Sequence, residues 1–183
     1  MKYRCFIALE TPDAVHASLS AKLRLLRPQP GVKWVEEQNL HLTLLFLGDV
    51  EAGLIPELEA LIRENVSGCR TFPLALKGLE LFPARAPRLV WASLAHRDEE
   101  LFRLHKELLG SLRRNGFEPD PKPLKLHITL GRIRNQLPPL LEKEIMAGEV
   151  ERSWQNYGTL TLYRSVLKPE GPTYHVLEQY KMP

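Results

Sequence analysis

The 183-residue sequence contains only two cysteines, Cys5 and Cys69, and they stand far apart. Two isolated thiols cannot build a disulfide framework, and neither belongs to a CxxC metal-binding pattern. Because free cysteine packs as a small hydrophobic residue, we expect both to be structural. The scarcity of cysteine argues against a disulfide-stapled domain and a zinc-bound domain. It favours a reducing, cytoplasmic setting.

Long apolar runs and an excess of one charge are also missing. The apolar stretch near the N-terminus is too short to span a membrane and lacks the features of a signal peptide, so we expect no membrane association. Lysine and arginine total 25 against 22 acidic residues, a net charge of +3. This balance permits an anionic ligand, but it differs from the dense basic face of proteins that coat long nucleic acids.

Three common catalytic motifs do not occur. The sequence has no G-x-S-x-G, no phosphate-binding P-loop and no HExxH. Serine hydrolase, nucleotide kinase and zinc protease activities therefore lose their usual support.

Hydrophobic periodicity predicts a mixed order of helices and strands. The triplet Thr11-Pro12-Asp13 predicts a helix that reaches about Leu26, with Thr11 as its N-cap. Further helices are predicted over 53–66 and 99–114. Strands are predicted over 5–9, 32–35, 40–47, 72–79, 89–94, 126–130, 159–166 and 174–178.

This order contains one internal repeat. A strand, a helix and a strand carrying His-x-Thr are followed later by a helix and a second strand carrying His-x-Thr. The repeat suggests a duplicated α+β unit. Because the elements lack a strict βαβ rhythm, largely antiparallel sheets with outer helices are favoured. We expect residues 1–183 to form a single two-lobed domain.

The two His-x-Thr motifs are the strongest chemical signal. His-Leu-Thr-Leu begins at His41, and His-Ile-Thr-Leu begins at His127. With six histidines and seven threonines in the chain, chance gives roughly 0.2 such pairs. Residues i and i+2 share one face of a strand, so His41 projects with Thr43 and His127 with Thr129. If the two strands face each other, two imidazoles meet two hydroxyls.

Such an arrangement suits phosphodiester hydrolysis. One neutral imidazole can take a proton from water as it attacks phosphorus, and a second, protonated imidazole can give a proton to the departing ribose oxygen. Threonine hydroxyls can hold the phosphate oxygens. Because the histidines handle both protons, no metal or other cofactor is expected. A lone strand histidine is more often a packing or surface residue, but a matched pair favours catalysis.

The chain resembles the LigT-like RNA 2′,3′-cyclic phosphodiesterases of the two-histidine phosphoesterase superfamily. The resemblance runs across nearly all of the sequence. Besides both motifs, it is carried by Phe6-Ile7-Ala8-Leu9, Trp34-Val35, Asn39-Leu40, Phe46-Leu47-Gly48, Phe82-Pro83, Pro87-Arg88, Val90-Trp91, Gly116-Phe117, Gly131-Arg132, Tyr163-Arg164-Ser165 and Gly171-Pro172-Thr173-Tyr174.

The resemblance implies a bilobal fold with an active-site cleft between the lobes. It also implies hydrolysis of a terminal 2′,3′-cyclic phosphate of RNA to a 2′-phosphate. His41 would be the proton donor to the leaving oxygen and His127 the base, while Thr43 and Thr129 would bind phosphate. One departure is that Lys125-Leu126 precedes His127, where the family usually has an aromatic residue and a proline.

Other candidate residues have a functional and a structural interpretation. Arg132 suits phosphate binding, but its odd offset from His127 puts it on the opposite strand face unless Gly131 allows a bulge. Trp34 and Phe46 could stack a base, although core packing is favoured for both. His105 is expected to be solvated.

Several alternatives to RNA-end hydrolysis stay open. The same site could serve 2′–5′ RNA ligation or hydrolysis of a small cyclic nucleotide. A non-catalytic module that holds an RNA end would not need a matched proton donor and acceptor. The expected partner is thus RNA with a 2′,3′-cyclic phosphate end or a small cyclic nucleotide, and a monomer is expected.

Overall fold

The computed structural model describes residues 1–169 and 171–183. It has four α-helices, two short 3₁₀ turns and nine strands among these residues. The helices are α1 (Asp13–Leu26), α2 (Ile55–Val66), α3 (Glu100–Arg114) and α4 (Pro139–Met146). The 3₁₀ turns are η1 (Glu37–Asn39) and η2 (Ala52–Leu54). The strands are β1 (Lys2–Glu10), β2 (Val32–Trp34), β3 (His41–Glu51), β4 (Phe72–Phe82), β5 (Leu89–His96), β6 (His127–Ile133), β7 (Trp154–Tyr157), β8 (Thr159–Leu167) and β9 (Pro172–Lys181).

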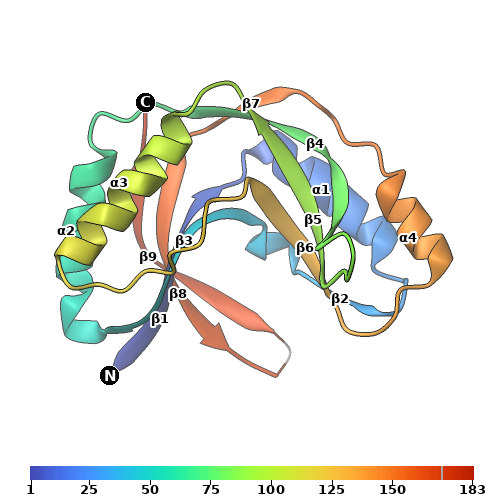
Figure 1. Ribbon diagram of the computed structural model, residues 1–183, viewed down its shortest axis with the longest axis horizontal. Helices are drawn as coiled ribbons and strands as arrows, with labels where there is room; N and C mark the ends of the chain where they lie inside the picture. Colours follow the sequence, from blue (N-terminus) through green and yellow to red (C-terminus); the bar gives the residue numbers. More distant parts are fainter. Residues whose placement is uncertain (170) are drawn as a thin grey trace.

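The strands form two antiparallel sheets. Sheet A has the order β3-β1-β8-β9, and sheet B has the order β2-β6-β5-β4-β7. In Figure 1 the two sheets form the two sides of an arch. Helices α2 and α3 pack against each other and against strands β9 and β3 of sheet A, whereas α4 packs against β4 of sheet B. The predicted α+β class, with antiparallel sheets and outer helices, is confirmed.

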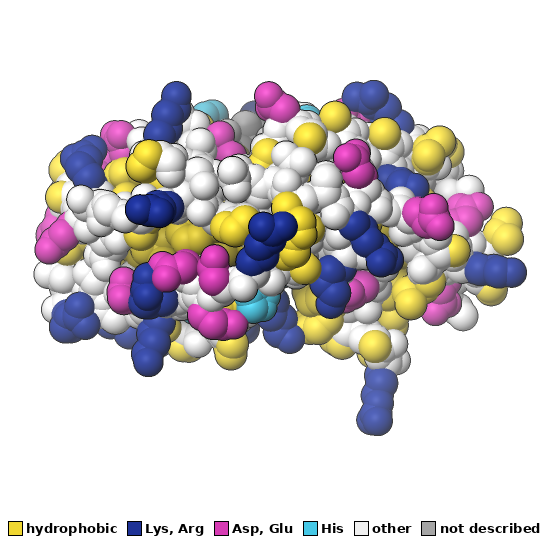
Figure 2. All heavy atoms as spheres, turned by 90° about the horizontal axis from the view of Figure 1, so that it is seen from above, with side chains coloured by type: hydrophobic (Ala, Val, Ile, Leu, Met, Phe, Trp, Pro, Cys, Tyr) yellow, Lys and Arg dark blue, Asp and Glu magenta, His cyan; other side chains and the backbone are white. Residues whose placement is uncertain are grey.

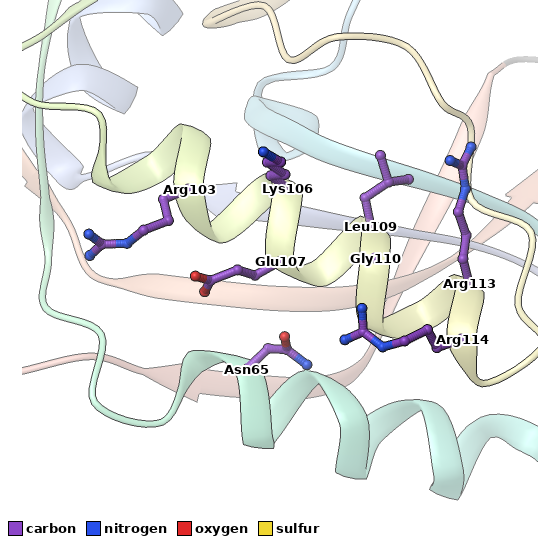
Figure 3. Close-up of a pocket in the computed structure, with 8 residues that line it drawn as sticks. All are labelled: Asn65, Arg103, Lys106, Glu107, Leu109, Gly110, Arg113 and Arg114. Atoms are coloured by element: carbon purple, nitrogen blue, oxygen red, sulfur yellow. The ribbon is translucent and has the colours of Figure 1, made fainter.

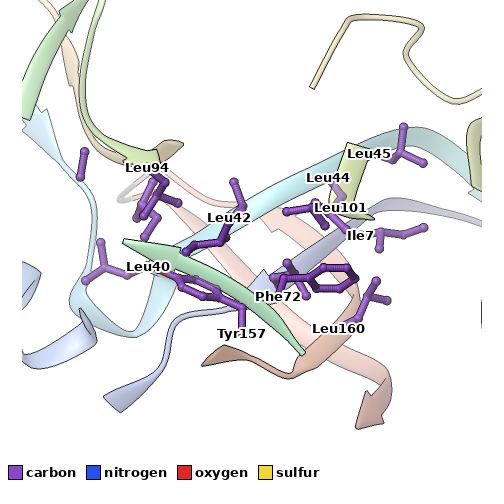
Figure 4. Packing of buried hydrophobic residues seen from close by; sticks show 14 of the residues in the cluster. Ile7, Leu40, Leu42, Leu44, Leu45, Phe72, Leu94, Leu101, Tyr157 and Leu160 are labelled. Atoms are coloured by element: carbon purple, nitrogen blue, oxygen red, sulfur yellow. The ribbon is translucent and has the colours of Figure 1, made fainter. Parts of the chain in front are cut away.

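Neither sheet is built from one continuous stretch of chain. The chain starts in sheet A, visits sheet B as β2, returns as β3, builds the rest of sheet B from β4 to β7, and ends in sheet A. One cluster of buried side chains contains residues of both sheets. Figure 4 shows Ile7 and Leu42 of sheet A gathered with Phe72, Leu94 and Tyr157 of sheet B. This interleaving favours a single domain over 1–183, which stays a prediction.

Two local predictions need correction. Thr11 does not cap α1, which begins at Asp13 with Pro12 as its N-cap and no side-chain cap. The Thr11 hydroxyl instead donates to the backbone oxygen of Leu40, at 3.3 Å. The other correction is that α4 and β7 occupy a stretch for which no element was predicted. Helix α4 buries only Leu141 and Ile145, so its sequence shows little periodicity.

On the face shown in Figure 2, lysine and arginine side chains alternate with acidic ones, without a broad field of one sign. None of the described helices is long and apolar enough to cross a membrane.

Candidate active site

Strands β3 and β6 share one irregularity just after their His-x-Thr motifs. In the pairing of β1 with β3, Ala8 lies opposite Thr43 and Ile7 opposite Leu45, which leaves Leu44 without a partner. In the pairing of β5 with β6, Trp91 lies opposite Thr129 and Val90 opposite Gly131, which leaves Leu130 without a partner. Both strands therefore bulge at the fourth residue of the motif.

The bulges reverse the side-chain alternation beyond each motif, since an extra residue shifts every later side chain to the other face. Arg132 thereby returns to the face that carries His127 and Thr129, opposite Leu89. The bulge that a phosphate contact by Arg132 requires is therefore present. Phe46 returns in the same way to the face of His41, opposite Phe6, and its side chain is 53% exposed. The prediction that Phe46 packs in the core is therefore wrong.

Gly131 is needed for this geometry. A Cβ atom added there would overlap the Val32 Cγ1 atom and stand 2.9 Å from Cε3 of Trp34, both in the neighbouring strand β2. We expect Gly131→Ala to destabilise the fold by about 1–3 kcal/mol through overpacking. Chemical denaturation would measure this loss, with Gly53→Ala, where a Cβ meets nothing within 4 Å, as the matched control. An unchanged free energy of unfolding in Gly131→Ala would contradict the described packing of β2 on β6.

Both histidines are held in the same orientation by the backbone. The Nδ1 atom of His41 lies 2.7 Å from the carbonyl oxygen of Asn39, and that of His127 lies 2.8 Å from the carbonyl oxygen of Lys125. A carbonyl oxygen only accepts, so in each ring Nδ1 carries a proton and donates it. In the neutral rings Nε2 therefore holds the free lone pair. Each imidazole can take up or release a proton at Nε2.

The surroundings of His41 are aromatic. The Phe6 ring lies 5.0 Å from the imidazole and the Tyr174 ring 5.4 Å, in an edge-on arrangement. The Thr43 hydroxyl lies 2.9 Å from Nε2. Burial lowers the pKa of His41 to about 4, against the pull of the Asn39 carbonyl, and the charge of His127 lowers it further. His41 is consequently neutral at pH 7 in the free protein.

His127 stands against a stack of two aromatic rings. Its imidazole lies 4.2 Å from the Trp91 ring, which is itself stacked on Phe82 at 4.0 Å. The Trp91 indole N–H donates to a carboxylate oxygen of Glu80 at 3.2 Å. Burial lowers the pKa of His127, and the charge of Lys125 adds to that effect. Among the described residues, no hydrogen-bond partner occupies its Nε2 atom.

The two motifs meet at the junction of the sheets, where β3 and β6 are in contact. The histidines are close enough that the charge of one lowers the pKa of the other. Thr43 and Thr129 are both half-buried. Arg132 is exposed. Burial raises the pKa of Tyr174, and the positive charge of Arg132 opposes that rise, which places the guanidinium near the ring beside His41. The site thus brings together side chains from both sheets, namely His41, Thr43, His127, Thr129 and Arg132.

Several neighbours of this site were given no role at the site by the sequence. They are Phe6, Tyr163 and Tyr174 around His41, and Phe82, Trp91 and Glu80 beside His127. Each alternates with core residues on its strand, but only the pairing of strands reveals which face meets a histidine.

The remaining histidines have no threonine two residues further along the chain. His105 was expected to be solvated, yet its side chain is only 7% exposed, so that prediction is wrong. It belongs to the buried face of α3, and burial lowers its pKa.

The hollow shown in Figure 3 lies between α2 and α3 and is lined by none of the predicted site residues.

Known proteins are similar to this chain in sequence and in fold. Residues 9–91 match the family described as LigT like Phosphoesterase. The RNA 2′,3′-cyclic phosphodiesterase of Thermotoga maritima is 33% identical over 95% of this chain and 92% of its own length. The crystal structure of TT0787 of Thermus thermophilus superposes with a TM-score of 0.85, at 31% identity over 98% of this chain and 97% of that one. That of Escherichia coli LigT complexed with 3′-AMP shares the fold, with a TM-score of 0.76, at 24% identity over 100% of this chain and 99% of that one.

A two-sheet fold with a His-x-Thr motif in each sheet defines the class of two-histidine phosphoesterases. Within that class, this chain belongs to the LigT-like phosphoesterase family.

Proposed function

We propose that the protein hydrolyses the terminal 2′,3′-cyclic phosphate of RNA to a 2′-phosphate. The observation that carries this proposal is the matched orientation of His41 and His127, each with Nδ1 held by a carbonyl and Nε2 left for proton transfer. The similar protein of Thermotoga maritima is an RNA 2′,3′-cyclic phosphodiesterase, which points to the same substrate.

In the proposed reaction, Nε2 of neutral His127 takes a proton from a water molecule. The water oxygen forms a bond to phosphorus while the bond from phosphorus to the ribose 3′ oxygen breaks. Protonated His41 gives its Nε2 proton to that oxygen, and the phosphate stays on the 2′ oxygen. The next turnover begins once His127 has lost its proton and His41 has gained one.

Thr43, Thr129 and Arg132 bind the phosphate in this proposal. The two hydroxyls can donate to non-bridging oxygens, and the guanidinium can stabilise the charge that develops on them. A bound phosphate anion also favours the charged form of a nearby imidazole. Substrate binding therefore raises the pKa of His41 from its low value in the free protein and supplies the acid.

His127 is the better placed of the two to act as the base. Its Nε2 atom is free of a side-chain partner among the described residues, whereas Nε2 of His41 already meets Thr43. The family resemblance assigns the same roles. The reverse reaction, with an RNA hydroxyl in place of water, would be 2′–5′ ligation and uses the same two groups.

Incubation of the purified protein with a short RNA that ends in a 2′,3′-cyclic phosphate, in excess EDTA, tests the proposal. We expect turnover to a 2′-phosphate that EDTA does not reduce, because the two histidines handle both protons. A well-folded protein that turns over neither this RNA nor a nucleoside 2′,3′-cyclic phosphate would overturn the proposed activity. A 3′-phosphate product would overturn the assignment of the leaving oxygen.

We also propose that the chain works as a monomeric, single domain in the cytoplasm. The support for this setting is that Cys5 and Cys69 are both free thiols, as suits a reducing compartment.

A further inference from the structure

The two sheets present different chemistry to the site. Around His41, sheet A contributes aromatic rings, among them Phe6, Tyr163 and Tyr174. Sheet B contributes Arg132, and the loop that leads into its strand β6 contributes Lys125. These two cations lie on either side of His127 along the chain. A nucleotide between the sheets would meet apolar rings on one side and positive charges on the other.

Lys125 is coupled to His127 in three ways. Its carbonyl oxygen accepts the Nδ1 proton of the imidazole, at 2.8 Å. Its ammonium lies 4.6 Å from the centre of the Phe82 ring, the outer member of the stack that runs through Trp91 to His127. The positive charge also contributes to the lowered pKa of His127, so the ammonium is within electrostatic reach of the reacting groups.

The ammonium of Lys125 is exposed and unneutralised. No acidic side chain among residues 1–169 and 171–183 forms an ion pair with it. Neighbouring Lys122, by contrast, is paired with Asp120 at 2.7 Å. Lys33, another cation of sheet B, donates to the carbonyl oxygen of Pro169 at 3.3 Å. Lys125 therefore rests on an aromatic face with its charge available to an anion.

We propose that the Lys125 ammonium binds the phosphodiester immediately upstream of the terminal nucleotide, so that the site favours an RNA end over a cyclic mononucleotide. This inference rests on the proposed function, in which the histidines, the threonines and Arg132 engage the cyclic phosphate. In an RNA chain the nearest further anion is the phosphodiester one nucleotide upstream. The Lys125 side chain lies on the Phe82–Trp91 stack, beyond the base histidine. Its ammonium is therefore suited to bind this upstream phosphodiester.

Three substrates separate this contact from the chemistry. The first is a nucleoside 2′,3′-cyclic phosphate, which has no upstream phosphate. The second is a dinucleotide with the same cyclic end. The third is that dinucleotide with its internal linkage replaced by an uncharged methylphosphonate. The readout is the ratio of kcat/KM for each dinucleotide to kcat/KM for the mononucleotide, taken within one enzyme. Any effect of the Lys125 charge on His127 is common to all three substrates and cancels in this ratio.

We expect wild type to favour the charged dinucleotide and to lose about tenfold of that preference with the methylphosphonate. Lys125→Met should lose the preference to a similar extent and become indifferent to the linkage charge. Lys125→Arg should retain the preference, because it keeps a cation at this position. Lys122→Met is the matched control, since it removes a neighbouring lysine that already has a partner.

The outcomes distinguish this inference from the function on which it rests. If Lys125→Met turns over the cyclic mononucleotide and keeps the wild-type ratio for both dinucleotides, the upstream contact is overturned and the hydrolase stands. An equal loss of the ratio in Lys122→Met and Lys125→Met would also overturn it, because general surface charge would then explain the preference. If folded wild type turns over none of the three substrates, the proposed function fails and the subsite fails with it.

Discussion

Replacing His127 by alanine is expected to lower kcat for an RNA 2′,3′-cyclic phosphate by about 10²–10⁴-fold, the usual contribution of a general acid or base. The same loss is expected for His41→Ala, since each imidazole handles one of the two protons. Because the two act in one step, the double variant should lose little more than either single one. Single-turnover rates, with each enzyme in saturating excess over the RNA, measure all three losses.

The control for this experiment is His96→Ala, which removes an exposed histidine at the end of β5 that lies beside Glu99 and Phe102 and outside both motifs. Its rate should match that of wild type. If either motif variant retained wild-type kcat, that histidine would have no part in proton transfer. Losses that multiply in the double variant would indicate that the two residues act in separate steps.

The pH dependence of kcat/KM is the second large effect that we expect. In the free protein the pKa of His41 is lowered to about 4, and that of His127 lies below its usual value of 6.5. The reactive form needs one proton, on His41. Above pH 6.5 both rings are neutral, so kcat/KM should fall about tenfold for each further pH unit. On the acid side, it should fall again below about pH 4, where both rings become protonated.

The profile of kcat should differ, because it reports the complex. The bound phosphate anion stabilises an imidazolium, so the alkaline limb of kcat should lie at higher pH than that of kcat/KM. The two limbs belong to the coupled pair and not to one residue. A kcat/KM that rises steadily from pH 6 to pH 9 would contradict the low pKa values and the proposed proton positions.

Much of the site could be predicted from the sequence because strand alternation is regular over short distances. His41 and Thr43 share a face, as do His127 and Thr129, and two such pairs exceed chance. The predicted α+β fold with antiparallel sheets followed from the order of the elements and from the family resemblance.

The alternation failed where the backbone departs from it. A bulge cannot be read from Leu44-Leu45, two similar residues in a row, so Phe46 was assigned to the core. At Gly131 the glycine did signal a bulge, and Arg132 could be placed conditionally. The neighbours Phe6, Trp91 and Lys125 depend on how strands from distant parts of the chain pair, which a single sequence does not specify.

The most direct test of the central claim is a change of leaving group. We would measure kcat for an RNA end whose bridging 3′ oxygen is replaced by sulfur, since a thiolate departs without a proton donor, given a thiol pKa of about 8.5. If His41 protonates the leaving oxygen and His127 activates water, His41→Ala should regain most of its lost rate on this substrate, and His127→Ala should stay as slow as before. Rescue of His127→Ala instead would reverse the two roles. Equal losses of both variants on the oxygen and sulfur substrates would contradict general acid catalysis by either histidine.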